Sequence, residues 1–228
     1  MKSPSRSPSP PRTQPHVDEP RCPGMRIAGE SVGADRRGDR AIAIRDPYSE
    51  RTVGWVPKAT VEEVRRAFDI ARGYRARLTR HERARILDAA ASLVRARSAE
   101  IAALITAESG LSLKDSTYEA GRVADVLTFG AGETLKDDGQ IFSCDLTPHG
   151  KRRRVYTQRD PLLGVISAIT PFNHPMNQVA HKVVPAVATN NRIVLKPSEK
   201  VPLTPTRTSE LLDEAGLPPG GFGLVGKV

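Results

Sequence analysis

The sequence predicts an α/β fold in which a parallel βαβαβ unit, 161–228, follows a helical amino-terminal part, 25–139, and a two-stranded arm, 140–160. Two short runs rich in Val and Ile, Leu163–Ile169 and Arg192–Lys196, have the composition of strands buried on both faces. Between them, apolar residues recur at helical spacing from Met176 to Val187. A helical connection between neighbouring strands makes them parallel with a right-handed crossover, so this region is the centre of the predicted fold.

The chain begins with a segment dominated by Pro, Ser and Arg, and we expect a disordered tail over 1–24 because almost no apolar side chain is available for burial. Two interpretations stay open: a phosphorylated or targeting segment, or a start codon assigned upstream of a true start at Met25. Further along, Ala41–Ile44 and Thr52–Val56 alternate around turn residues, which is typical of a hairpin.

Two capping boxes predict where amino-terminal helices begin. Each pairs a threonine with a glutamate three residues later, as in Thr60 with Glu63 and Thr79 with Glu82. A further helix is expected over about Lys114 to Leu135. The apolar residues of these helices recur on one face, so the pattern indicates packing as their role.

Residues 140–160 alternate on both sides of a Pro-His-Gly turn, which predicts the two-stranded arm. Its basic run, Lys151–Arg154, has two interpretations: a nucleic-acid patch, or charges that keep an exposed strand from pairing. We favour the second. After Glu199, a helix is expected to stop at Gly216, and Phe222–Val225 is expected to be the third parallel strand.

The segments that follow the first two parallel strands carry polar groups suited to a binding site. Because both strands run in the same direction, Thr170–His174 and Lys196–Lys200 must emerge at one carboxyl edge of the sheet, where doubly wound folds bind ligands. This edge would hold an amide, an imidazole, a cation and a carboxylate, from Asn173, His174, Lys196 and Glu199 respectively.

These segments also carry a family resemblance. PLLGVISAITPFNHP and IVLKPSE resemble the aldehyde dehydrogenase superfamily, and TPFNHPMNQVAHKV is most similar to its phosphonoacetaldehyde and lactaldehyde dehydrogenase branch. The resemblance implies the amino-terminal part of a Rossmann-like cofactor domain with an arm for oligomerisation. It also implies a homo-oligomeric oxidoreductase that uses NAD to oxidise an aldehyde, such as phosphonoacetaldehyde, to its acid through a thioester.

The resemblance assigns roles to individual residues. It makes Asn173 the side-chain donor of the oxyanion hole, and losing one such donor commonly raises the barrier by about 2.7 to 4 kcal/mol. It places cofactor-binding residues at Ile169, Thr170, Pro171, Phe172, Lys196, Ser198 and Glu199. Glu199 can accept hydrogen bonds from both ribose hydroxyls but would repel a 2′-phosphate, so we expect NAD rather than NADP.

Arg122 has two interpretations. It is either a surface arginine paired with Glu119 or Asp125, or a substrate residue that acts with His174 on the anionic end of a phosphonate or phosphate aldehyde, because arginine makes bidentate bonds to such groups.

The family's glycine-rich turn, general-base glutamate and nucleophilic cysteine correspond to positions beyond Val228, so the sequence predicts a truncated form without turnover of its own. Cys22 and Cys144 do not match the nucleophile position, and we expect both to be ordinary thiols. The alternative is a non-catalytic fragment of the family that binds nucleotide or pairs with other subunits.

Composition limits the remaining classes. The formal net charge is +9, but the arginines alternate with Glu and Asp on expected helices, which is typical of solvated faces rather than of a nucleic-acid binder. No apolar run approaches the roughly 20 residues of a membrane span. Two cysteines indicate a reducing compartment, so we expect a cytoplasmic protein. No histidine stands at metal-ligand spacing, and no metal is expected.

Overall fold

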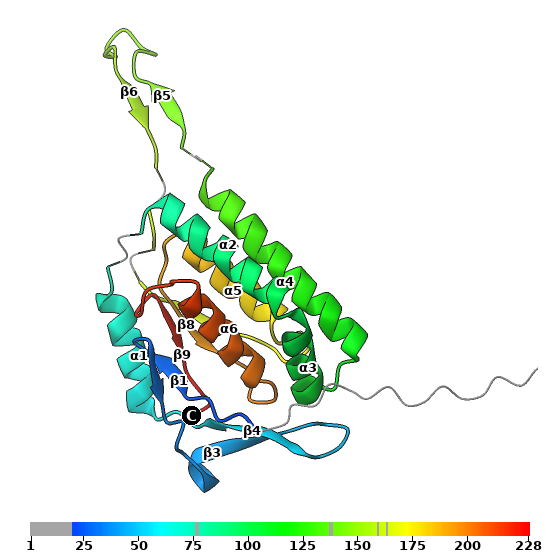
Figure 1. The fold of residues 1–228 in the computed structure, drawn as a ribbon. Coiled ribbons are helices and arrows are strands. Elements are labelled where there is room, and N and C mark those ends of the chain that lie inside the picture. The colour runs from blue at the N-terminus through cyan, green and yellow to red at the C-terminus, as the bar shows by residue number, and fades with distance from the viewer. Residues whose placement is uncertain (1–19, 76–77, 137–138, 159, 163) are drawn as a thin grey trace, which may run out of the picture.

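The computed structural model describes residues 20–75, 78–136, 139–158, 160–162 and 164–228. At its centre is a five-stranded sheet with the order β2-β1-β9-β8-β7 (Figure 1). Its strands are β1 (Met25–Ile27), β2 (Glu30–Val32), β7 (Ile166–Ile169), β8 (Ile193–Lys196) and β9 (Phe222–Leu224). The last three are parallel, whereas β1 pairs antiparallel with both β2 and β9. The predicted α/β class with a parallel βαβαβ unit is confirmed.

Helices cover both faces of this sheet. The connections α5 (Asn177–Ala188) and α6 (Leu203–Glu214) lie on one face with α2 (Arg80–Ala96), α3 (Ser98–Ser109) and α4 (Leu113–Thr134), while α1 (Val61–Gly73) lies on the other. Strand β8 shows the division. Ile193 and Leu195 pack in the larger core with α2 to α6, and Val194 packs with α1. Successive side chains of β8 point to opposite faces of the sheet and therefore pack into two separate cores. The continuous apolar run in this strand predicts burial on both faces.

The helix starts agree with the capping boxes in the sequence. Thr60 and Glu63 at the start of α1, and Thr79 and Glu82 at the start of α2, exchange both reciprocal hydrogen bonds. Each box satisfies backbone N–H groups that have no partner inside their helix.

Two hairpins lie outside the central sheet. The expected one over 41–56 is present as β3 (Ala41–Arg45) and β4 (Thr52–Pro57), preceded by a short 3₁₀ turn, η1 (Gly38–Arg40). The expected arm is present as β5 (Ile141–Ser143) and β6 (Arg154–Tyr156), and it projects away from the body of the molecule in Figure 1.

The amino-terminal segment needs a correction. The tail was expected to extend to Gly24, but the chain is already packed at Arg21, whose N–H donates to Val53 O at 3.0 Å and whose O accepts from Trp55 N at 2.8 Å. These bonds continue the pairing of β4, and Gly24 is buried against Ser31 and Val32. The partners, Val53 and Trp55, are 32 and 34 residues away along the chain, so local composition cannot reveal them. Residues 1–19 of the expected tail lie outside the described residues.

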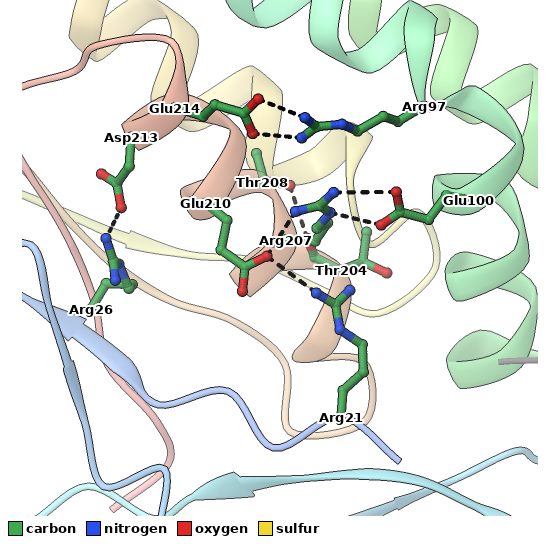
Figure 2. A network of polar contacts seen from close by, with 10 residues as sticks. All are labelled: Arg21, Arg26, Arg97, Glu100, Thr204, Arg207, Thr208, Glu210, Asp213 and Glu214. Carbon is green, nitrogen blue, oxygen red and sulfur yellow. Dashed lines mark hydrogen bonds and ion pairs between the residues drawn. The ribbon is translucent and has the colours of Figure 1, made fainter. Parts of the chain in front are cut away.

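The side chain of Arg21 belongs to a network of ion pairs around α6, shown in Figure 2. Glu210 accepts from Arg21 at 3.2 Å and from Arg207 at 3.0 Å, and Arg207 also contacts Glu100 of α3 at 3.0 Å. Further pairs join Arg97 to Glu214 through two bonds of 2.6 Å and Arg26 to Asp213. The paired side chains are between 15% and 51% exposed, so water still reaches them. Ion pairs that water reaches contribute about 0 to 1 kcal/mol each, so the main effect of this network is to fix which segments lie against α6.

Candidate functional site

The loops that follow β7 and β8 lie side by side, as the parallel topology requires. Ile169 stands opposite Lys196 in the register, and the N–H of Thr170 donates to Lys196 O at 3.3 Å. Beyond the strands, the ammonium of Lys200 lies 4.4 Å from the centroid of the Phe172 ring. A cation at this distance from an aromatic face is attracted to it. The prediction that both loops emerge at one edge is therefore confirmed.

The first loop, Thr170–His174, exposes most of its side chains. Ile169, at the end of β7, is 68% exposed and Phe172 is 52% exposed, which is unusual for large apolar residues. Thr170 is the exception, because it is buried and its hydroxyl has no hydrogen-bond partner within the described parts of the chain. A buried hydroxyl without a partner is costly, so it marks a position where a ligand atom would be favourable.

The second loop, Lys196–Lys200, carries the expected cation and carboxylate. Lys196 Nζ lies 3.3 Å from Glu199 Oε2, and Lys227 Nζ lies 3.7 Å from Glu199 Oε1. The backbone N–H of Glu199 and the Lys196 ammonium hold the pKa of this carboxyl below its ordinary value. A pocket lined by Ser198 and Glu199 opens next to them, and Pro23 forms part of its wall.

The helices that follow the two loops are held by buried glutamates. Helix α5 begins after Met176 and α6 after Pro202, and neither residue provides a side-chain cap. For α5, Glu119 of α4 accepts from the N–H groups of Met176 at 2.8 Å and Asn177 at 2.9 Å. Its other oxygen lies 3.3 Å from Nδ1 of His174. One carboxyl group thus connects α4 to three points of the first loop and its helix.

Glu108 of α3 has the corresponding role for α6. It accepts from the N–H groups of Leu203 and Thr204, both at 2.8 Å. Burial raises the pKa of Glu108 to about 7, although the two backbone donors oppose the shift. Sequence reasoning missed both residues as capping groups. The available signal was the absence of Ser, Thr, Asp or Asn at the two N-cap positions, Met176 and Pro202, which implies a cap from elsewhere in the fold.

Arg122 lies at the surface, as the first of its two interpretations expects, but it does not pair with Glu119. The expected pairing with Glu119 is wrong, because Glu119 is turned inward to the start of α5. Arg122 is exposed, and its Nη1 lies 3.4 Å from the hydroxyl of Tyr118 one turn earlier. Its role toward a substrate stays a prediction.

Neither cysteine belongs to the two loops. Cys22 lies in the segment paired with β4, and Cys144 follows β5 in the arm. Within the described ranges, no three His, Cys, Asp or Glu side chains gather in a group that could hold a metal ion. None of the helices described here combines the length and apolar character that a membrane span requires.

Comparison with known proteins gives a consistent result. A family model described as the aldehyde dehydrogenase family matches residues 34–227. The 3-sulfolactaldehyde dehydrogenase of Priestia megaterium is 34% identical over 180 residues, which cover 78% of this chain and 38% of that protein. The chain thus spans well under half the length of this relative.

Solved structures share the fold over a similar part of their length. An NAD-dependent aldehyde dehydrogenase from Sinorhizobium meliloti matches with a TM-score of 0.80 and 30% identity over 93% of this chain and 43% of that one. An NADP-dependent glyceraldehyde-3-phosphate dehydrogenase from Bacillus halodurans, complexed with NADP, matches with a TM-score of 0.82 and 32% identity over 90% and 44%. Both dinucleotides therefore occur among the structural neighbours.

Proposed function

Because the chain belongs to the aldehyde dehydrogenase family, we propose that it supplies the dinucleotide side of an active site that oxidises an aldehyde to a carboxylic acid with NAD. The observation that carries this proposal is the shared edge of the two loops, Thr170–His174 and Lys196–Lys200. Doubly wound folds bind their ligands at this edge. A buried hydroxyl that has no hydrogen-bond partner among the described residues, an ammonium and an ionised carboxylate are the groups that a ribose and its phosphates would engage.

Each loop has its own part in this function. Lys196 and Glu199 would hold the adenosine ribose, with Ser198 beside them, and Ile169, Thr170, Pro171 and Phe172 would line the rest of the dinucleotide cleft. The amide of Asn173 would donate to the oxygen on which negative charge develops when the aldehyde carbonyl is attacked. NAD, when bound, supplies the hydride acceptor.

The test is a fluorescence titration of the 228-residue chain with NADH. We expect saturable binding and an affinity about tenfold lower in Glu199→Gln, because hydrogen bonds to a charged group contribute about 1.5 to 3 kcal/mol. Glu133→Gln is the matched control, since Glu133 is an exposed carboxylate at the far end of α4 paired with Lys136. Its affinity for NADH should equal that of the wild type.

A parallel titration with NADPH tests the expected preference for NAD over NADP. Because the Glu199 carboxylate would repel a 2′-phosphate, NADPH should bind the wild type more weakly than NADH, and the difference should shrink in Glu199→Gln. A folded wild-type chain that binds no NADH, or an unchanged affinity in the Glu199 variant, would contradict the proposal.

The finer part of the proposal concerns the substrate. We propose that Arg122 and His174 bind an anionic group of the aldehyde, such as a phosphonate, because the first is an exposed guanidinium and the second a half-exposed imidazole. The relative from Priestia megaterium is named for a sulfonated aldehyde. In an active enzyme that carries these residues, Arg122→Ala should raise KM for phosphonoacetaldehyde more than for propanal. Equal changes in both KM values would reject the assignment.

We further propose that the arm formed by β5 and β6 contacts another subunit. Its strands expose large apolar side chains: Ile141, Phe142, Val155 and Tyr156 are each at least 50% exposed. Exposed apolar residues gathered on one element commonly mark an interaction surface.

A further inference from the structure

One buried carboxyl group connects the loop that carries Asn173 and His174 to the helical layer. The side chain of Glu119 is 1% exposed. Its Oε1 accepts from the N–H groups of Met176 and Asn177, and its Oε2 faces Nδ1 of His174 at 3.3 Å. The His174 side chain is 49% exposed, so one edge of the ring contacts Glu119 while the ring as a whole remains accessible.

The arrangement decides which nitrogen of His174 carries hydrogen. A carboxylate only accepts hydrogen bonds, and Oε1 of Glu119 already accepts from the two N–H groups at the start of α5. The ring nitrogen that faces a carboxylate must therefore be the N–H. A neutral imidazole has one N–H, so the hydrogen is on Nδ1 and the lone pair is on Nε2.

We propose that Glu119 is a positioning residue of the site: it holds the Asn173–His174 loop and fixes His174 in the tautomer with hydrogen on Nδ1. Nε2 is then the nitrogen left for a ligand. It accepts a hydrogen bond from a substrate hydroxyl when the ring is neutral, and donates one to an anionic group when the ring is protonated. This inference rests on the proposed function only in assigning the loop to an active site.

The chain offers a matched pair of variants. In Glu119→Gln, the amide oxygen has to face the two backbone N–H groups, because an NH₂ group there would oppose two donors. The NH₂ group then faces Nδ1 and donates to it, which moves the ring hydrogen to Nε2. Glu108→Gln makes the same replacement at the start of α6, where the glutamate accepts from Leu203 and Thr204 instead.

The experiment is ¹⁵N NMR of the histidine side chains in the 228-residue protein, at a pH where His174 is neutral, with the signal assigned through His174→Gln. We expect His174 to be the Nδ1–H tautomer in the wild type and in Glu108→Gln, and the Nε2–H tautomer in Glu119→Gln. An Nε2–H tautomer in the wild type would overturn the proposal. So would a folded Glu119→Gln protein with the wild-type tautomer.

Amide hydrogen exchange tests the hold on the loop. Glu119→Ala should accelerate exchange at Met176 and Asn177 by about tenfold or more, because two donors lose their acceptor, while Leu203 and Thr204 keep their rates. Equal acceleration at both helix starts would indicate general loosening and overturn the positioning role. If the Glu119 variants do not fold, the tautomer of His174 in the wild-type protein tests the proposal on its own. None of these readings requires NADH binding, so failure of the proposed function would be recognised separately.

Discussion

Glu108 is a buried acid whose folded state binds protons more readily than the unfolded chain. Its ordinary pKa of 4.5 is raised to about 7 by burial between α3 and α6. Between these two values the folded protein holds the extra proton, so stability falls as pH rises through this window. The contribution is complete below about pH 4.5 and lost above about pH 7, and 2.5 pKa units correspond to about 3 kcal/mol.

We therefore predict that Glu108→Gln is less stable than the wild type at pH 5, because one backbone N–H of α6 loses its acceptor. This deficit should shrink by up to about 3 kcal/mol between pH 5 and pH 8, because glutamine does not ionise. Urea unfolding at intervals over this range measures the difference. Parallel stability curves for the two proteins would contradict the assigned pKa.

The sequence identified the polar residues of the two loops, but not the buried glutamates that cap the helices after these loops. Asn173 and Lys196 could be placed at one edge because strand direction alone determines where a strand ends. Glu119 and Glu108 could not be identified as caps, because each acts on a helix more than 50 residues later in the chain. Nothing in their local sequence distinguishes them from solvated glutamates.

Among the elements, α4 and α5 approach closely at Gly130. A Cβ atom at this position would lie 2.2 Å from Cγ1 of Val184, which is buried, so the two helices or the valine side chain would have to shift. We predict that Gly130→Ala destabilises the protein by about 1 to 3 kcal/mol through overpacking.

Gly121 of the same helix is the matched control, because a Cβ there has no neighbour within 4 Å among the described atoms. Gly121→Ala should stabilise by about 0.5 to 1 kcal/mol, since alanine loses less backbone entropy in a helix. Urea midpoints of the two variants should therefore move in opposite directions. A loss of stability in both would point to a cause other than the α4–α5 contact.

Element prediction succeeded where the signal was local. Capping boxes and helical spacing gave the starts of α1 and α2 and the extent of α4 to within a residue. Strands β1 and β2 were missed, because three residues each are too short to show alternation. Strand β7 begins at Ile166, whereas the sequence predicted a start at Leu163. Residue 163 itself lies outside the described residues.

For the molecule as a whole, the exposed apolar side chains of the arm lead to a prediction about self-association. We predict that the wild-type chain associates with increasing concentration and that replacing Ile141 and Phe142 together by serine reduces this association without changing the fold. Both side chains are at least 50% exposed on β5, so the monomer loses no core contact. Sedimentation velocity over a concentration series, with circular dichroism for the fold, measures both effects.

Phe129→Ser is the control for this experiment, because Phe129 is 72% exposed on α4 rather than on the arm. Its association should match the wild type. A wild-type chain that stays monomeric at every concentration, or an equal effect of the two replacements, would exclude the arm as the contact surface.

Because Arg21 packs beside Trp55, the intrinsic fluorescence of this tryptophan can report on the position of the amino-terminal segment. Trp55 is the only tryptophan in the chain, its backbone is bonded to Arg21, and the guanidinium of Arg37 lies 5.9 Å from its ring centroid. Indole emission responds to nearby charge and to water. The emission wavelength of Trp55 should therefore report whether the segment Arg21–Pro23 is packed against β4. Pro23 of this segment lines the pocket that contains Glu199, so the signal also reports on that pocket without an added dye.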